Sequence, residues 1–219
     1  MKMLLLELFS GTGSVGRAFA EAGWEVLSLD GDVSSGADVR CDILQWDPPE
    51  GLVPDHVHAS PPCTEYSLAK TTGVRNLELA DAIVKKTLGI LELLRGRNPR
   101  LTFSVESPWT GLLKSREFMQ EFNSHLKVVN YCKYGLKYKR ATAVWTNLAH
   151  WEPRPLCTKA SPCPGLVDGR HELTAQRGTK RDLKTGICRG GSCSRDTLYA
   201  IPPELCREWA VAATAALSS

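Results

Sequence analysis

The sequence predicts an α/β domain with a mainly parallel sheet, and three observations lead to this fold class. Short apolar runs alternate with segments of helical periodicity along the first 150 residues. A glycine-rich turn, SGTGS, joins the first apolar run to the first helical segment. Asp30, Cys63 and Glu106 stand where apolar runs end. In parallel sheets, functional groups gather beyond the carboxyl ends of the strands.

Each predicted element follows from its own pattern. Strands are predicted where short apolar runs occur, at residues 3–9, 25–30, 55–60, 100–108, 126–132 and 140–147. Helices are predicted where apolar residues recur every three or four positions, at residues 15–23, 77–95 and 201–217. Gly23 is suited to end the first helix, Pro108 to stop the fourth strand, and Pro202 to begin the last helix.

Length and composition indicate one soluble domain with room for a small second element. The chain has 219 residues, of which 42% are hydrophobic and 23% charged, and its net charge is +3. Its start, MKMLLLELFSGTG, lacks the form of a signal peptide, and no stretch approaches the ~18 apolar residues of a membrane span. Eight cysteines without a secretion signal favour a reducing compartment. We expect a cytoplasmic protein, nuclear in a eukaryotic host, that acts as a monomer without a membrane partner.

The composition changes between residues 151 and 196, where prolines, glycines and four of the eight cysteines gather without hydrophobic periodicity. We therefore expect a main domain at 1–150, a small insert at 151–196, and a final segment at 197–219 whose helix returns to the main domain. Residues 151–195 hold nine Lys or Arg and four Asp or Glu, whereas the rest of the chain is slightly acidic. This balance favours a polyanionic partner, although a solvated, loop-rich surface explains the charge equally well.

The insert is too short to build a core of its own, and a segment of this size needs a staple. A tetrahedral zinc ion has four ligand positions, and the insert offers five candidate ligands, Cys157, Cys163, His171, Cys188 and Cys193. The gaps within the two cysteine pairs are slightly wider than is common for structural zinc, and free thiols are the alternative. We expect a small, irregular, metal-stapled insert with a structural zinc ion.

The glycine turn has the form of a nucleotide-binding loop. Gly11, Gly13 and Gly16 lie between the first strand and the first helix, where glycine lets a ligand approach the backbone and the helix N-terminus supplies donors. Asp30 ends the second strand and is placed to accept hydrogen bonds from ribose hydroxyls. Phe9 precedes the loop and offers a ring that could stack on adenine. The alternative is a tight turn beside a surface acid.

The motifs, taken in order, resemble a known family. They are LELFSGTGSVGRAF, Asp30, CDI, SPPCTEYS, FSVESP and YGLKYKRATAVW, and they resemble the motifs of S-adenosylmethionine-dependent DNA (cytosine-5) methyltransferases. The resemblance covers residues 4 to about 147 and returns in the final helix. Proline-proline-cysteine at a strand end is its most specific element, because amino-methylating relatives carry an aromatic residue where this chain has Cys63. The resemblance implies a Rossmann-like class I methyltransferase domain.

The resemblance also implies the chemistry of the site. C5 of cytosine is a poor nucleophile until another nucleophile adds at C6, and the Cys63 thiolate would make that addition. Glu106 matches the family glutamate near the ring N3, and Arg140 matches the first arginine of a pair that contacts the base O2 and orients the cysteine region. S-adenosylmethionine would be bound by Phe9, Gly11, Thr12, Gly13, Asp30, Asp42, Ile43 and Pro61.

Double-stranded DNA is the expected partner, with the target cytosine flipped out of the helix. Ser67, Lys70 and Arg75 lie in the segment after Cys63, at 64–76, which would close over the flipped base. Two solvated loop charges explain the cations equally well. The insert would read a short target, such as a dinucleotide or trinucleotide, through Arg170, Arg177, Lys180, Arg181 and Arg189.

Three departures from the family pattern leave other functions open. Ser107 stands where the family has asparagine, Thr142 stands where it has a second arginine, and the glycine-asparagine before the last helix is missing. The alternatives are a tRNA cytosine-5 methyltransferase and a methyltransferase-like nucleic-acid-binding regulator without turnover. Restriction–modification and phage or viral self-protection are both compatible with the sequence as biological roles.

Overall fold

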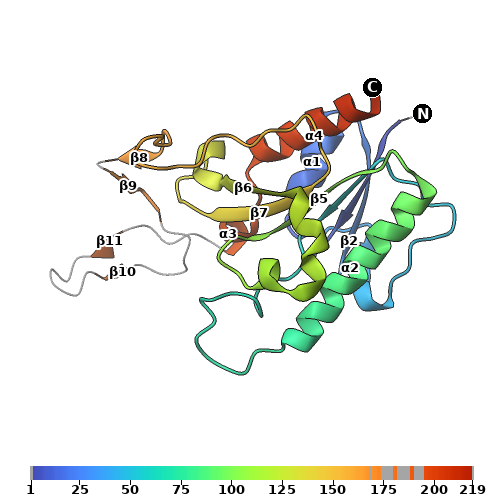
Figure 1. Ribbon diagram of the computed structural model, residues 1–219, viewed down its shortest axis with the longest axis horizontal. Coiled ribbons are helices and arrows are strands. Elements are labelled where there is room, and N and C mark those ends of the chain that lie inside the picture. Colours follow the sequence, from blue (N-terminus) through green and yellow to red (C-terminus); the bar gives the residue numbers. More distant parts are fainter. Residues whose placement is uncertain (1, 168, 174–179, 182–187, 190–194, 219) are drawn as a thin grey trace.

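A seven-stranded sheet with helices on both faces forms the body of the computed structural model (Figure 1). The structure describes residues 2–167, 169–173, 180–181, 188–189 and 195–218. The strand order is β3-β2-β1-β4-β5-β7-β6. The first five strands in this order are parallel, and β7 is antiparallel to both of its neighbours, β5 and β6. This topology confirms the predicted α/β class with a mainly parallel sheet.

The strands of the sheet follow the short apolar runs of the sequence. They are β1 (Leu4–Leu8), β2 (Glu25–Asp30), β3 (Val39–Arg40), β4 (His56–Ala59), β5 (Thr102–Pro108), β6 (Leu126–Asn130) and β7 (Ala141–Thr146). The strands β1, β4 and β5 are buried along nearly their whole length, because helices cover both of their faces.

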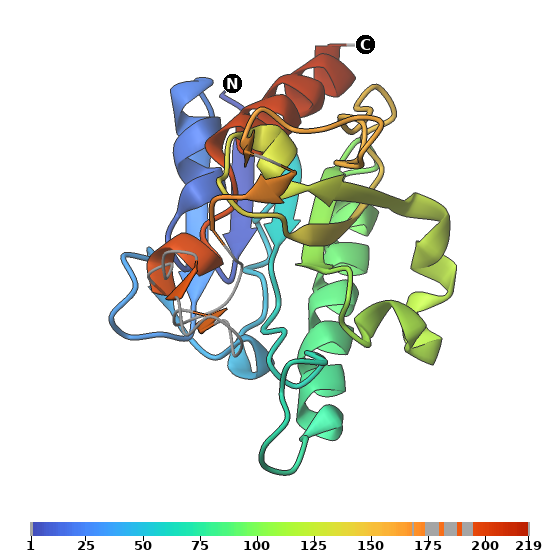
Figure 2. The same cartoon turned by 90° about the vertical axis from the view of Figure 1, so that its left-hand side faces the viewer.

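The helices lie in two layers. They are α1 (Ser14–Glu21), α2 (Leu77–Arg97), α3 (Arg195–Tyr199) and α4 (Pro203–Ser218), and the short 3₁₀ helices are η1 (Ile43–Gln45), η2 (Leu113–Ser115), η3 (Glu117–Met119), η4 (Glu121–His125) and η5 (Tyr131–Tyr134). Figures 1 and 2 show α2 on one face of the sheet and α1 with α4 on the other.

Each face of the sheet has its own core. Leu91 and Leu94 of α2 pack with Phe103 of β5 on one side, and Phe19 of α1 packs with Trp209 of α4 on the other. These five side chains and Leu5 of β1 are almost completely buried. The Asn76 side chain caps the N-terminus of α2 by accepting from the Leu79 N–H.

The end of one predicted strand needed correction, and several short elements were not predicted. The strand predicted at 126–132 ends at Asn130, because the chain turns there into η5, which Gly135 closes with a φ of +93°. The short elements β3 and α3 were not predicted, and neither were the two-stranded hairpins β8 (Leu166–Val167) with β9 (Arg170–His171) and β10 (Lys180–Arg181) with β11 (Cys188–Arg189). Elements this short carry no measurable periodicity.

The parallel strands bring the predicted site residues to one edge of the sheet. Because β1, β2, β4 and β5 run in the same direction, the turns after Leu8, Asp30, Ala59 and Glu106 all lie at their carboxyl ends. Both chain termini lie at the other end of the molecule from β8 and β9 (Figure 1). Within the described residues, no helix combines the length and the apolar character that crossing a membrane requires.

Candidate active site

The turn after β1 is held in an unusual backbone conformation. Gly11 and Gly13 have φ values of +49° and +64°, which glycine adopts without strain. Phe9 has a φ of +58° although it carries a bulky side chain, and such strain is typical of functional sites. The Ser10 N–H donates to the carbonyl of Leu29 at 3.1 Å, which fastens the turn to the end of β2.

Two carboxylates stand beside this turn at the same edge. Asp30 accepts from the Gly11 N–H through Oδ2 at 2.7 Å and from the Asp32 N–H through Oδ1 at 2.8 Å. Each oxygen keeps one further lone-pair direction for a ligand hydroxyl. Asp42 accepts from the Leu44 N–H at 3.0 Å and thereby caps η1, in which Ile43 is buried.

A third carboxylate, Glu7, lies buried beneath the turn. It accepts hydrogen bonds from the backbone of Gly16 and Val15, and burial nevertheless raises its pKa to about 7. A Cβ atom at Gly16 would lie 2.5 Å from a Glu7 carboxylate oxygen. Any larger residue at this position would therefore displace the Glu7 carboxylate.

Cys63 lies just beyond the carboxyl end of β4, where Pro61 and Pro62 stop the strand. Its thiol is half-buried. Burial raises the pKa of this thiol, the negative charge of Glu106 raises it further, and the positive charge of Arg140 lowers it. Cys63 is therefore a thiol rather than a thiolate in the free protein at neutral pH.

Glu106, on β5, is buried and receives two donors on the same oxygen. The Tyr131 hydroxyl donates to Oε1 at 3.0 Å, and Nη2 of Arg140 lies 3.4 Å from Oε1. Nη1 of Arg140 donates to the carbonyl of Leu198 in α3 at 2.6 Å. Burial lowers the pKa of Arg140, but Glu106, Tyr131 and Cys63 raise it by more, so the guanidinium stays charged. The structure thus brings all three predicted catalytic residues into one electrostatically coupled group.

A buried chain of polar side chains leads from the base of the sheet to the cysteine turn. His56 joins Thr102 at 2.8 Å and Ser104 at 3.0 Å, and His58 joins Ser104 at 2.8 Å and Ser60 at 3.0 Å. Burial lowers the pKa of His58 to about 3. Burial also lowers the pKa of His56 well below its usual value, and the nearby His58 lowers it further. Sequence reasoning did not predict this chain, because the two histidines read as polar interruptions of a strand.

These histidines are expected to make the fold sensitive to acid. Below pH 6.5 the unfolded chain binds protons that the buried imidazoles do not, so the histidines' contribution to the free energy of unfolding falls as the pH drops from about 6.5 towards 4. Glu7, with its pKa raised to about 7, contributes in the opposite direction and does so equally in every variant compared. The expected slope is at most about 1.4 kcal/mol per pH unit for each histidine. Urea unfolding between pH 7.5 and 4.5 measures this slope. His58→Gln should flatten it by one proton, whereas His150→Gln, at an exposed position, should leave it unchanged. Equal slopes in all three proteins would contradict the assignment.

Residues 64–76 form a loop that is folded back on itself. Lys70 donates to both oxygens of Glu65 at 2.6 and 2.7 Å, and Arg75 donates to the carbonyls of Glu65 and Lys70 at 2.7 and 3.0 Å. The Ser67 hydroxyl accepts from the Ala69 N–H. Both predicted DNA-binding cations are therefore engaged within the loop, and they would have to leave these partners to reach a phosphate.

Of the cations predicted in the insert, Arg170 is exposed on β9. Arg177 lies outside the described residues. For Lys180 and Arg181 in β10 and Arg189 in β11, the structure describes the backbone alone.

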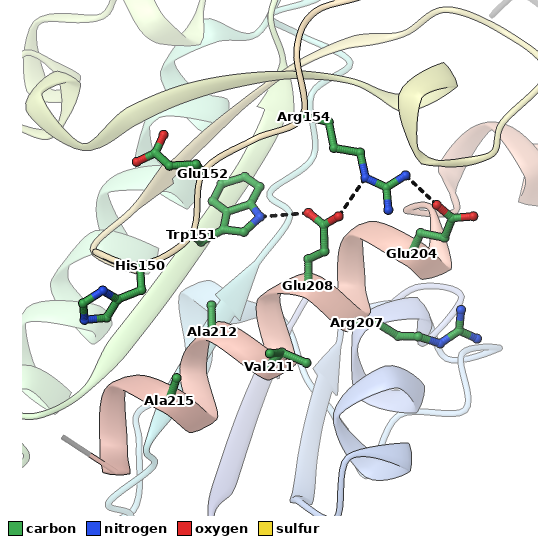
Figure 3. A pocket seen from close by; sticks show the side chains of 10 residues that line it. All are labelled: His150, Trp151, Glu152, Arg154, Glu204, Arg207, Glu208, Val211, Ala212 and Ala215. Atoms are coloured by element: carbon green, nitrogen blue, oxygen red, sulfur yellow. Dashed lines mark hydrogen bonds and ion pairs between the residues drawn. The ribbon is translucent and has the colours of Figure 1, made fainter. Parts of the chain in front are cut away.

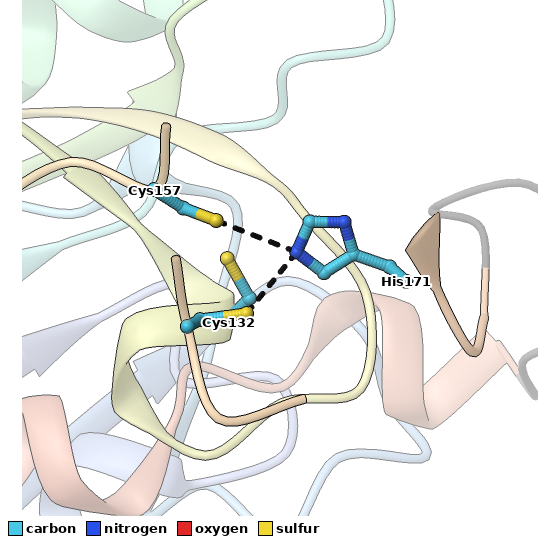
Figure 4. Close-up of side chains that lie close together, drawn as sticks. Cys132, Cys157 and His171 are labelled. Carbon is cyan, nitrogen blue, oxygen red and sulfur yellow. Dashed lines mark hydrogen bonds between the residues drawn. The ribbon is translucent and has the colours of Figure 1, made fainter. Parts of the chain in front are cut away.

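Four side chains, one from η5 and three from the predicted insert, lie close together (Figure 4). Cys132, Cys157, Cys163 and His171 place their ligand atoms within 4.8 Å of one another. Nε2 of His171 lies 3.7 Å from Sγ of Cys157 and 3.3 Å from Sγ of Cys163. Three of these residues were predicted as ligands.

The fourth member of the cluster, Cys132, was missed, because the sequence placed it at the end of a strand in the main domain. Of the other two predicted ligands, Cys193 lies outside the described residues. For Cys188, the structure describes the backbone alone, in β11.

A hollow of about 540 Å³ lies elsewhere on the surface, between residues 150–154 and α4 (Figure 3). Arg154 donates to Glu208 at 2.8 Å and to Glu204 at 2.6 Å, and the Trp151 indole donates to Glu208 at 3.1 Å. None of the predicted site residues lines this hollow. Its contacts fasten the start of the insert to α4.

Parts of the chain are similar to parts of three solved structures. A mutant of Spodoptera frugiperda DNMT2 is 15% identical, with a TM-score of 0.49, and the match covers 74% of this chain and 57% of that one. The Dnmt2 methyltransferase of S. pombe is 12% identical, with a TM-score of 0.45, and the match covers 67% and 49%. The glycopeptide N-methyltransferase MtfA is 15% identical, with a TM-score of 0.38, and the match covers 67% and 83%.

No family model matches the chain. A curated relative does: over 223 residues the chain is 31% identical to a probable DNA (cytosine-5)-methyltransferase of Frog virus 3 (isolate Goorha). This alignment spans 93% of the present chain and 96% of the viral protein, so it includes both the sheet with its site and the insert. The chain therefore belongs to the family of DNA (cytosine-5)-methyltransferases.

Proposed function

We propose that the protein transfers a methyl group from S-adenosylmethionine to C5 of a flipped cytosine in double-stranded DNA, with Cys63 as the covalent nucleophile. The observation that carries this proposal is the coupled group of Cys63, Glu106 and Arg140 at the carboxyl edge of the sheet. It combines a nucleophile, an acid and a fixed positive charge, which are the parts that addition to a pyrimidine ring needs.

The turn after β1 fits the proposed cofactor. Gly11 and Gly13 present bare backbone, and Asp30 has lone pairs left for the two hydroxyls of a ribose. Phe9 and Ile43 supply apolar surface for an adenine ring, and Thr12, Asp42 and Pro61 complete the predicted set. When bound, S-adenosylmethionine supplies the methyl group as an electrophile on a positively charged sulfur.

Cys63 begins the reaction by adding to C6 of the cytosine. The new C–S bond moves electron density towards C5 and N3, and a proton on Glu106 neutralises the charge that develops at N3. Once methyl transfer to C5 has released the cofactor as a neutral thioether, a base would take the C5 proton, N3 would return its proton to Glu106, and the C–S bond would break. The ring double bond is restored and the thiolate of Cys63 is released.

Two neighbouring charges act on the Cys63 thiol in opposite directions. The negative charge of Glu106 raises the pKa of the thiol, in the same direction as burial, whereas Arg140 lowers it. Arg140 is therefore the neighbour that favours the thiolate needed for attack on C6.

The basic insert suits a polyanionic substrate, and we propose DNA because the curated relative is a probable DNA (cytosine-5)-methyltransferase. Nine Lys or Arg and four Asp or Glu fall between residues 151 and 195. Arg170 lies exposed on β9, and the remaining predicted cations, Arg177, Lys180, Arg181 and Arg189, follow it in the chain. A reader of this size would touch few base pairs, so we propose a short target sequence.

We propose zinc for the cluster of Cys132, Cys157, Cys163 and His171. Three thiolates and one imidazole are a common ligand set for structural zinc. All four positions of a tetrahedral ion are filled by protein atoms, so the proposed role is structural rather than catalytic.

Transfer of labelled methyl groups tests the proposal. Purified protein, S-adenosylmethionine and either unmethylated double-stranded DNA or tRNA are incubated in parallel, and methylated bases are mapped at single-base resolution. Label at cytosine C5 in DNA, within a short motif, is the expected result. Label in tRNA alone would show that the substrate is tRNA, while the proposed reaction at cytosine C5 would still stand. Cofactor binding without transfer to either substrate would contradict the proposal and favour a non-catalytic regulator.

A further inference from the structure

The connection between β6 and β7, residues 131–140, carries both partners of the acid Glu106. Its first residue, Tyr131, donates to Oε1 of Glu106 at 3.0 Å, and its last residue, Arg140, lies 3.4 Å from the same oxygen. The Tyr131 N–H donates to the carbonyl of Arg140 at 3.0 Å, which ties the two ends together. The guanidinium of Arg140 also stacks over the Tyr131 ring, 5.1 Å from its centroid. The connection therefore sets where both partners of Glu106 stand.

Residues of the insert also form hydrogen bonds with this connection and with Asn130, which directly precedes it. The Arg154 N–H donates to the Tyr134 hydroxyl at 2.9 Å, and the Cys157 N–H donates to the buried Asn130 side chain at 2.9 Å. Further hydrogen bonds join Lys133 to Pro162, Lys139 to Cys157 and Leu173 to Lys137. The connection is therefore hydrogen-bonded both to residues of the insert and to Glu106.

The Cys/His cluster joins these two sides at one point. Cys132 directly follows Tyr131 in η5, whereas Cys157, Cys163 and His171 come from the insert. A tetrahedral zinc with Zn–S near 2.3 Å and Zn–N near 2.0 Å places sulfur and nitrogen about 3.5 Å apart. The distances from Nε2 of His171 to Sγ of Cys157 and Cys163, 3.7 and 3.3 Å, bracket this value. These three side chains are spaced as ligands of a single ion, and Sγ of Cys132 lies within 4.8 Å of each of their ligand atoms.

We infer that zinc bound at this cluster is a positioning device for the catalytic acid, acting through Cys132 and Tyr131. The inference rests on the proposed function, which gives Glu106 its role. Fixing Cys132 to the insert fixes the start of η5, and the adjacent Tyr131 then holds Glu106 together with Arg140. Without the ion, only hydrogen bonds would join the insert to the connection, and the side chains of Tyr131 and Arg140 would become more mobile. Loss of zinc is therefore expected to slow catalysis even in protein that stays folded.

A double-mutant cycle between Cys157→Ala and Tyr131→Phe tests this inference. Cys157→Ala removes a ligand on the insert side and should lower the zinc content from about one ion per chain to near none. It should also lower kcat by about tenfold, with KM for S-adenosylmethionine unchanged. Tyr131→Phe should keep the zinc and lower kcat to a similar extent. The double variant should be no slower than Cys157→Ala, because both changes break the same line of contact.

Two further variants separate positioning from general damage. Cys157→His offers another zinc ligand and should recover both metal and kcat, and Ala160→Ser, at an exposed position of the same loop, should change neither. The rate of Cys63 alkylation as a function of pH gives a readout without turnover, since displaced Glu106 and Arg140 would shift that profile.

Three outcomes would overturn the inference. They are protein purified without chelator that holds no zinc, kcat and alkylation profiles unchanged by loss of zinc, and multiplicative losses in the double variant. Wild-type protein that turned over no nucleic acid would instead refute the proposed function, and the alkylation profiles of the same variants would still decide the inference.

Discussion

Replacing Cys63 with alanine is expected to lower methyl transfer at least about 10⁴-fold while leaving S-adenosylmethionine binding intact. The thiol is the only group in the coupled site that can form and then break a bond to C6, so no neighbour replaces it. The turn after β1, which we propose binds the cofactor, is formed by other residues and should be unaffected. Transfer of labelled methyl groups, together with calorimetric titration of the cofactor, measures both quantities.

A mechanism-based substrate makes the same prediction sharper. In DNA that carries 5-fluorocytosine at the target, fluorine cannot leave C5 as a proton does, so the C–S bond persists after methyl transfer. Mass spectrometry should find the DNA attached to Cys63. Cys41→Ala, at another partly exposed cysteine, should retain activity and form the adduct. An adduct at any other cysteine, or turnover retained in Cys63→Ala, would contradict the assignment of the nucleophile.

The sheet and its edge could be predicted from the sequence because local pattern decides them. The run EVLSLD gave β2 at Glu25–Asp30 to the residue, and helical periodicity gave the start of α2 at Leu77. The rule that parallel strands share a carboxyl edge then placed Asp30, Cys63 and Glu106 together. Each of these steps uses only residues close in sequence, or a general property of parallel sheets.

The partners of Glu106 and the full ligand set of the cluster could not be predicted in this way. Tyr131 and Cys132 read as the end of a strand, and nothing local indicates that the chain turns into η5 after Asn130. Their contacts depend on the strand order, in which β7 lies between β5 and β6 and brings residues 131–140 back towards Glu106. The strand order is a property of tertiary packing, and the hydrophobic periodicity of the sequence does not reveal it.

Glu106→Gln is expected to have two effects of opposite sign on the same site. Methyl transfer should fall by about 10²- to 10⁴-fold, because glutamine cannot deliver a proton to N3. Alkylation of Cys63 in the free protein should become faster at pH 7.5. The negative charge of Glu106 raises the pKa of the thiol, so a neutral side chain lets the pKa fall and the thiolate fraction rise.

A second variant separates this charge effect from a structural one. A variant that merely loosened the site would expose Cys63 and slow catalysis whichever charge it removed, so Glu106→Gln and Arg140→Met would then both be alkylated faster. Arg140→Met removes the charge that lowers the thiol pKa, so its alkylation should be slower than in the wild-type protein. Glu121→Gln, which neutralises an exposed carboxylate on η4, should alter neither rate. Alkylation that slowed in Glu106→Gln, or quickened in Arg140→Met, would show that these two charges do not control the nucleophile.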